Sequence, residues 1–163
     1  MYQGYGLQGV DDKGRVSIPS ALRNVVEANT PRRDGKDLAR IVTIAVHETE
    51  PCLVGYDETY SQKLQRDLTV RADATTEPGA PRNWNPNRLN FGVTDPLPFD
   101  ASGRFVLQGY PKKYAKIGKF ALFLGLGDVF EIWDPATLVA NPGTPTQLKE
   151  LASFLMEEKG AAL

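Results

Sequence analysis

The chain has 163 residues and a formal net charge of −1, with one histidine, His47, and one cysteine, Cys52. These counts leave too few ligands for zinc fingers, multi-histidine metal sites or disulfide scaffolds, and a lone cysteine is typical of a reducing, cytoplasmic compartment. No apolar run approaches the ~18 residues of a membrane helix. The first 20 residues do not resemble a secretory signal, so we expect neither export nor membrane association.

The charges are distributed unevenly along the chain. Residues 101–127 carry five basic side chains and no acidic one, whereas residues 41–60 carry four acidic and no basic side chains. The tail, residues 128–163, carries six acidic side chains against two basic ones. Because such asymmetry says more about partners than the net charge does, a near-neutral total does not exclude a nucleic-acid ligand.

Three helices have their own start or spacing signals in the sequence. Apolar residues at helical spacing after Pro19 indicate a helix over 20–28. Asp57 is placed to cap a second helix that carries apolar side chains at positions 60, 64 and 68. Near the C-terminus, Thr144 is the expected N-cap, Pro145 the expected first helical residue and Gly160 the expected end.

The segment between the second and third helices is rich in proline. Five prolines occur between residues 73 and 99. Since proline lacks an N–H donor and restricts φ, we expect residues 71–92 to form a connector without a long regular element.

The two halves of the chain that this connector divides are related. Residues 11–15 (DDKGR) recur as residues 100–104 (DASGR), and residues 52–56 align with 129–133. Each copy predicts a hairpin, a short helix and a second hairpin. We therefore divide the chain into a first repeat (5–60), a helix and connector (61–92), a second repeat (93–137) and a C-terminal amphipathic helix (138–163).

Each copy places an arginine directly after an Asp-x-x-Gly turn. Asp and Gly at these positions are typical of a tight hairpin turn, which explains them without any function. The arginines, Arg15 and Arg104, alternate with apolar residues that belong in a core, so they face outward. A guanidinium can bind guanine O6 and N7, or two phosphate oxygens, with two hydrogen bonds. The alternative is a weak surface ion pair.

A second basic feature follows the second turn. Lys112, Lys113, Lys116 and Lys119 cluster on the expected short helix and the loop after it. Such a cluster is often no more than a solvated surface, but beside Arg104 it predicts a patch that contacts phosphates.

The motifs at 9–19, 99–104 and 127–133 resemble the tandem SpoVT/AbrB-type repeats of MraZ transcriptional regulators. The resemblance implies a mainly β fold with short helices (α+β), in which the two repeats form one swapped-hairpin β-barrel. It also implies a cytoplasmic, nucleoid-associated repressor of the division and cell-wall gene cluster, which binds direct repeats in double-stranded promoter DNA as a ring-shaped homo-oligomer. The chain departs from the family pattern at Gln108, where a proline is usual, and at Pro111, so we expect a short second-repeat helix.

The resemblance assigns DNA contacts to the two turns and to the first helix. Lys13 and two residues of the lysine cluster complete our prediction. The candidate DNA-binding residues are Asp11, Lys13, Arg15, Arg23, Asp100, Arg104, Lys112 and Lys113.

Two other classes of function remain open. One is an AbrB-type antitoxin-like module whose acidic tail binds a partner protein, although the capped helix near the C-terminus disfavours a disordered tail. The other is an enzyme, for which we find no credible active site, no cofactor or metal site and no small-molecule substrate. We expect His47 and Cys52 to be structural.

Overall fold

The two repeats of the sequence fold as the same succession of elements. The computed structural model describes residues 1–31 and 40–163. The first repeat contains β1 (Tyr5–Gly9), β2 (Arg15–Ser17), α1 (Ser20–Asn29), β3 (Ile41–Val46) and β4 (Leu53–Tyr56). The second contains β5 (Thr94–Pro98), β6 (Arg104–Val106), α4 (Gly109–Tyr114), β7 (Phe120–Gly125) and β8 (Phe130–Trp133). The short α4 confirms the expectation for the second-repeat helix.

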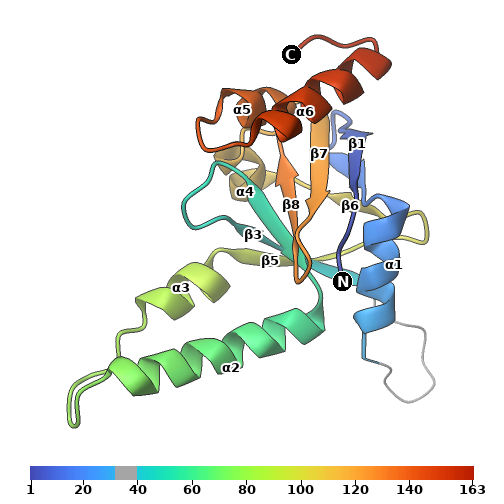
Figure 1. Cartoon of the computed structure of the whole chain (residues 1–163). Helices are drawn as coiled ribbons and strands as arrows, with labels where there is room; N and C mark the ends of the chain where they lie inside the picture. Colours follow the sequence, from blue (N-terminus) through green and yellow to red (C-terminus); the bar gives the residue numbers. More distant parts are fainter. Residues whose placement is uncertain (32–39) are drawn as a thin grey trace.

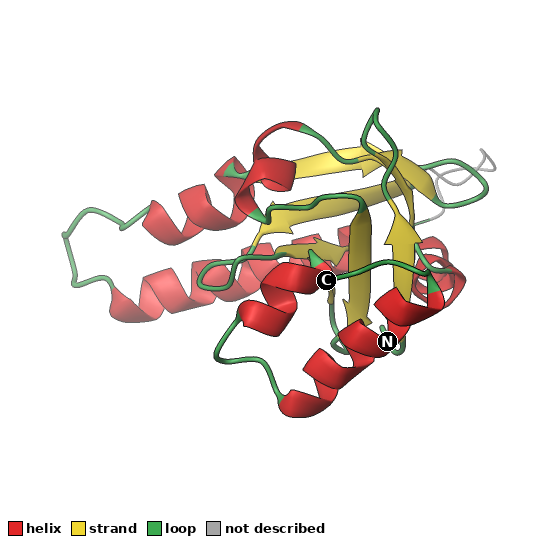
Figure 2. Ribbon diagram, turned by 90° about the horizontal axis from the view of Figure 1, so that it is seen from above, coloured by secondary structure: helices red, strands yellow, loops and turns green. Residues whose placement is uncertain are grey.

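The remaining helices lie outside this repeated pattern. α2 (Glu58–Thr75) and α3 (Asn85–Gly92) connect the repeats, lie side by side and extend away from the sheet as an arm (Figures 1 and 2). α5 (Pro135–Ala140) and α6 (Thr146–Glu158) pack against each other, and α5 contacts β7. None of the described helices is long and apolar enough to cross a bilayer.

Strands from both repeats pair with one another in a single antiparallel sheet. Its order is β1-β7-β8-β4-β3-β5, and β2 pairs with β6 in a separate two-stranded ribbon. The second hairpin of each repeat is confirmed by the β3–β4 and β7–β8 pairs. The predicted first hairpin of each repeat is wrong as a strand pair. β1 pairs with β7 rather than with β2, and β5 pairs with β3 rather than with β6. The fold is therefore mixed α+β, as expected.

The expected closed barrel is wrong for the part of the chain that the structure describes. The six-stranded sheet ends in two edges, β1 and β5, which do not pair with each other. β2 lies beside β1 and β6 lies beside β5, but these three-residue strands form their ladder with each other instead. The ribbon thus spans the open side of the sheet without closing it by hydrogen bonds.

Apolar side chains are buried on both faces of the sheet. Along β7, Phe123 belongs to a core that includes the ribbon and α1, whereas Leu122 belongs to a second cluster beneath α5 and α6. Both side chains are fully buried. Burial of each such side chain stabilises the folded state by roughly 1.5–3 kcal/mol relative to leaving it exposed. Because Ala152 and Met156 of α6 belong to the second cluster, the apolar stripe that the sequence predicts holds α6 to its own chain.

Asp57 caps α2 as predicted. Its Oδ1 accepts the backbone N–H of Tyr60 (2.9 Å), and its Oδ2 accepts the Tyr2 hydroxyl (2.6 Å) and the Asn29 amide (2.9 Å). The carboxylate is buried, so these three donors replace the water it loses. Asp57 thereby joins the N-terminus, the end of α1 and the start of α2.

The structure differs from two helix-boundary predictions. α6 begins at Thr146, with Pro145 at the capping position and no side-chain cap, because Thr144 instead closes a turn onto Asn141 (3.2 Å). Gly160 does end this helix, with φ of 65°.

The segment expected to be an irregular connector is largely regular. α2 continues through Thr75, and α3 accommodates Pro86 in its first turn, where an N–H is not required. Pro96 and Pro98 lie in β5, which tolerates them because it is an edge strand.

Candidate nucleic-acid interface

The first Asp–Arg turn is closed by a network around one carboxylate. Oδ1 of Asp11 accepts the backbone N–H groups of Lys13 (2.9 Å) and Arg15 (2.8 Å), and Oδ2 accepts Nε of Arg15 (2.6 Å). Gly14 has φ of 78°, a conformation that favours glycine. The turn therefore fixes the direction in which the Arg15 guanidinium leaves β2.

The second turn repeats this geometry. Oδ1 of Asp100 accepts the N–H groups of Ser102 and Arg104 (2.9 Å each), Oδ2 accepts Nε of Arg104 (2.8 Å), and Gly103 has φ of 80°. Both arginine side chains are more than half exposed. Among the described residues, each guanidinium is bound only through Nε, which leaves its terminal amino groups available to a ligand.

The carboxylates of the two turns stay ionised to a lower pH than an ordinary aspartate does. The backbone N–H of Arg15, followed by its guanidinium, holds the pKa of Asp11 below its ordinary value. Arg104 lowers the pKa of Asp100 through the same two contacts. Hydrogen bonds to a charged carboxylate favour that form, so both turns keep their geometry at neutral pH.

The β2–β6 ribbon brings the two arginines to one surface. Arg15 lies opposite Val106, and Ser17 lies opposite Arg104. Because alternate residues share a face, these four side chains point outward while those of Val16 and Phe105 enter the core. A shallow hollow of about 460 Å³ beside the ribbon is lined by residues that include both arginines.

The turns themselves lie at opposite ends of the ribbon. The N–H of Leu107 donates to the carbonyl of Gly14 (2.8 Å), and the N–H of Ile18 donates to that of Gly103 (2.9 Å). Gly14 and Ile18 are four residues apart, so at ~3.3 Å per residue the turns are separated by ~13 Å.

Two of the other candidate residues are tied to the ribbon by position or by contact. Arg23 is half-buried on α1, and its side chain lies over Gly103, since a Cβ at that glycine would stand 2.9 Å from Arg23 Cδ. Lys13 is exposed within the first turn. The structure therefore associates Arg23 of the first repeat with the turn of the second.

Of the lysines after the second turn, Lys112 and Lys113 lie on α4, whereas Lys116 and Lys119 lie beyond its end. Lys112 is half-buried and Lys113 is exposed. Lys112 is the counterpart of Arg23, because each follows its turn arginine by eight residues. Among the described residues, no hydrogen bond or ion pair links the side chain of either lysine to the ribbon, so their part in a phosphate-binding patch stays a prediction.

A separate cluster joins His47, Cys52 and Glu131, whose ligand atoms lie within 4.8 Å of one another. Nδ1 of His47 accepts the backbone N–H groups of Thr49 (3.1 Å) and Glu50 (3.0 Å), which leaves the ring proton on Nε2, the nitrogen that faces Glu131. Burial, and then the charge of Glu131, raise the pKa of the Cys52 thiol far above its ordinary value. Through the two hydrogen bonds to Nδ1, His47 stabilises the β3–β4 turn.

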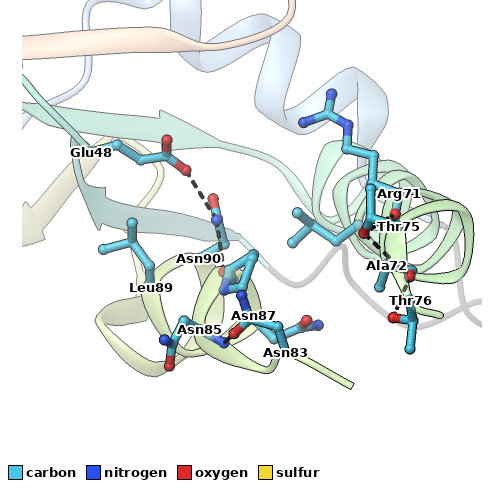
Figure 3. A pocket seen from close by; sticks show the side chains of 12 residues that line it. Glu48, Arg71, Ala72, Thr75, Thr76, Asn83, Asn85, Asn87, Leu89 and Asn90 are labelled. Atoms are coloured by element: carbon cyan, nitrogen blue, oxygen red, sulfur yellow. Dashed lines mark hydrogen bonds between the residues drawn. The ribbon is translucent and has the colours of Figure 1, made fainter. Parts of the chain in front are cut away.

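A pocket of about 450 Å³ lies between α2 and α3, and most of its lining residues fall in the segment 71–92 that the sequence predicts to be a connector (Figure 3). Asn90 Nδ2 donates to Glu48 Oε1 at 3.1 Å, and the hydroxyls of Thr75 and Thr76 donate to carbonyls of their own helix. Because both hydroxyls are used in this way, the lining offers no hydroxyl nucleophile activated by a base.

Sequence reasoning missed two residues of the arginine surface, Ser17 and Val106. No local sequence signal identifies either residue, because their pairing partners lie about 90 residues away in sequence. The alternation along each strand places them on the outward side, but only the register of the ribbon sets them beside Arg104 and Arg15.

Fold and site together define a tandem-repeat α+β protein that presents two carboxylate-braced arginines on one β-ribbon. The chain is 34% identical over 137 residues to the transcriptional regulator MraZ of Rhodospirillum rubrum, covering 82% of this chain and 79% of that protein. It is 30% identical to the MraZ of Acidithiobacillus ferrooxidans over 136 residues (83% and 84%) and 27% identical to that of Pseudoalteromonas translucida over 155 residues (94% and 93%). No model of a known protein family matches the chain. By these similarities the chain belongs to the MraZ family of transcriptional regulators.

Proposed function

We propose that this transcriptional regulator binds double-stranded DNA in a sequence-specific manner through the outer face of the β2–β6 ribbon. The observation that carries the proposal is the pair of arginines, Arg15 and Arg104, each fixed through Nε by its own aspartate. Within residues 1–31 and 40–163, no partner binds the terminal amino groups of either guanidinium. A major groove is ~12 Å wide and admits a two-stranded ribbon.

The fixed orientation of the guanidiniums favours base reading over loose phosphate attraction. Because Asp11 and Asp100 hold the Nε atoms, little side-chain freedom is lost when the amino groups bind guanine O6 and N7. Lys13, Arg23 and the lysines of α4 would supply contacts to phosphates, which position the ribbon without reading sequence.

Assembly into a ring would compensate for the small footprint of one ribbon. A three-residue strand pair spans ~10 Å, on the order of three base pairs. Such a contact cannot specify a promoter alone, but several ribbons of a ring-shaped homo-oligomer on direct repeats would multiply the affinity. We infer that the target is the promoter of the division and cell-wall gene cluster, and that binding represses it.

The antitoxin-like alternative finds no support in the tail. The acidic C-terminal region forms α6, whose Ala152 and Met156 are buried against this chain's own helices and sheet. A segment packed in this way is not available to wrap around a partner protein.

Substitution of the two arginines tests the proposal. In a gel-shift titration on that promoter, we expect Arg15→Ala and Arg104→Ala each to weaken specific binding by about tenfold to a hundredfold, because each removes one bidentate contact. Arg66→Ala, an exposed arginine on the α2 arm, is the matched control and should bind as the wild type does.

Two further readouts accompany this titration. Native mass spectra should show the same oligomer for all variants, since neither turn arginine contributes to the core. Wild-type affinity should fall steeply with salt, as counterion release requires. Unchanged promoter binding by the Arg15→Ala/Arg104→Ala double variant would refute the assignment.

A further inference from the structure

The outer face of the ribbon carries a pattern beyond its two arginines. Across the ribbon, Arg15 pairs with Val106 and Ser17 pairs with Arg104. These four side chains form the surface that the proposed function directs toward the major groove.

The ribbon backbone has an approximate two-fold symmetry. The Leu107–Gly14 and Ile18–Gly103 hydrogen bonds exchange with each other, at 2.8 and 2.9 Å. The same two-fold rotation exchanges Arg15 with Arg104. All the residues that it exchanges are equivalent positions of the two repeats, 89 residues apart in sequence. The aspartate contacts of the two turns also match to within 0.2 Å. A symmetric outer face would therefore read a symmetric base sequence.

Ser17 and Val106 break this symmetry. They are equivalent by position, yet one offers a hydroxyl and the other an isopropyl group that is 40% exposed between charged side chains. In the major groove, the base edges present hydrogen-bonding groups and one apolar group, the C5-methyl of thymine. A hydroxyl can pair with any base edge, whereas an exposed valine gains only from contact with that methyl.

We propose that Val106 contacts a thymine methyl, and that the Ser17/Val106 difference makes the base sequence read by one ribbon directional. The inference rests on the proposed DNA interface and assigns the residues that set its preference. The two arginines supply equivalent guanine contacts on either side, and a thymine is selected on the Val106 side only.

Selection from a pool of randomised duplexes tests the direction of reading. The wild type should enrich a non-palindromic core with thymine on one flank. Val106→Ser makes the outer face symmetric and should lose that thymine, giving a two-fold symmetric core. Ser17→Val, a second variant that keeps a strand-forming residue at 106, should add a thymine at the mirrored position. Val70→Ser, at a valine on α2 that is 66% exposed, should keep the wild-type core.

Removal of a single methyl group tests the contact itself. Replacing the selected thymine with deoxyuridine should weaken wild-type binding about fourfold, the effect of one methyl leaving an apolar contact. Val106→Ser should bind both duplexes equally.

The possible failures are distinguishable. If deoxyuridine is without effect and both ribbon variants enrich the wild-type core while Arg15→Ala still weakens binding tenfold or more, the directional reading is overturned and the DNA interface stands. If no sequence is enriched and Arg15→Ala binds as the wild type does, the proposed function fails with it.

Discussion

Replacement of Gly14 by alanine should destabilise the protein more than the same change at two other glycines with positive φ. Gly4, Gly14 and Gly103 have φ of 93°, 78° and 80°. The left-handed conformation alone costs an alanine ~1–2 kcal/mol at each position. What distinguishes the three sites is the space around the added methyl group.

At Gly14 the added Cβ would stand 2.3 Å from the carbonyl oxygen of Leu107. That atom is backbone, so β6 must move, and the Leu107 N–H bond to Gly14 is strained or lost. An unpaired N–H group costs ~1–3 kcal/mol, which, added to the ~1–2 kcal/mol of the left-handed conformation, brings the expected loss for Gly14→Ala to ~2–5 kcal/mol. At Gly103 the nearest atom, Cδ of Arg23, belongs to a flexible side chain, and the equivalent backbone carbonyl, that of Ile18, stands at 3.0 Å instead of 2.3 Å. At Gly4 no such atom lies within 4 Å.

Urea denaturation of the three variants, at one protomer concentration so that assembly contributes equally, measures these differences. The expected order of destabilisation is Gly14→Ala, then Gly103→Ala, then Gly4→Ala. Melting temperatures should follow the same order, at roughly 2–4 °C per kcal/mol for a chain of this size. A loss at Gly14 no larger than the loss at Gly4 would show that the close approach of the two strands is not a constraint.

Two further predictions concern an acidic titration and a tightly packed strand. Because the pKa of Asp11 is lowered in the folded state, its contribution to folding stability is present above the ordinary carboxyl pKa and is lost as pH falls through the lowered value. In Arg15→Ala, an NMR titration of the Asp11 carboxyl should still show a pKa below the ordinary value, because the hydrogen bond from the backbone N–H of residue 15 is the largest cause and remains. A return to the ordinary value would mean that the guanidinium dominates. Gly55→Ala should cost ~1–3 kcal/mol in thermal unfolding, because its Cβ would stand 2.2 Å from Cζ of the buried Phe130. Phe130→Leu should offset part of that loss, and additive losses in the double variant would contradict the explanation.

Local signals in the sequence predicted the parts of this fold that depend on neighbouring residues. The DDKGR and DASGR turns and the Asp57 cap use side chains within four residues of their partners. Such contacts are visible in the order of residue types. The same holds for α6, whose apolar stripe predicts a buried face although its first residue is set by the turn at Thr144.

Non-local pairing could not be predicted from the sequence. The β2–β6 register joins residues that are about 90 positions apart, and two strands of three residues carry too little pattern to identify each other. The sequence therefore predicts the two arginine turns as separate features, without the surface that joins them. The open sheet and the α2–α3 arm depend on the same long-range packing.

The exchange of strands between the repeats has a consequence for how such a chain can be built. β1 pairs with β7 and β2 with β6, so a half-chain with one repeat lacks partners for both strands and must obtain them from a second half-chain. Two identical half-chains would necessarily present identical outer residues. Joining them in one polypeptide removes that requirement, because each half can then change its side chains without changing the other. The covalent connection thus permits a symmetric scaffold to carry an asymmetric surface.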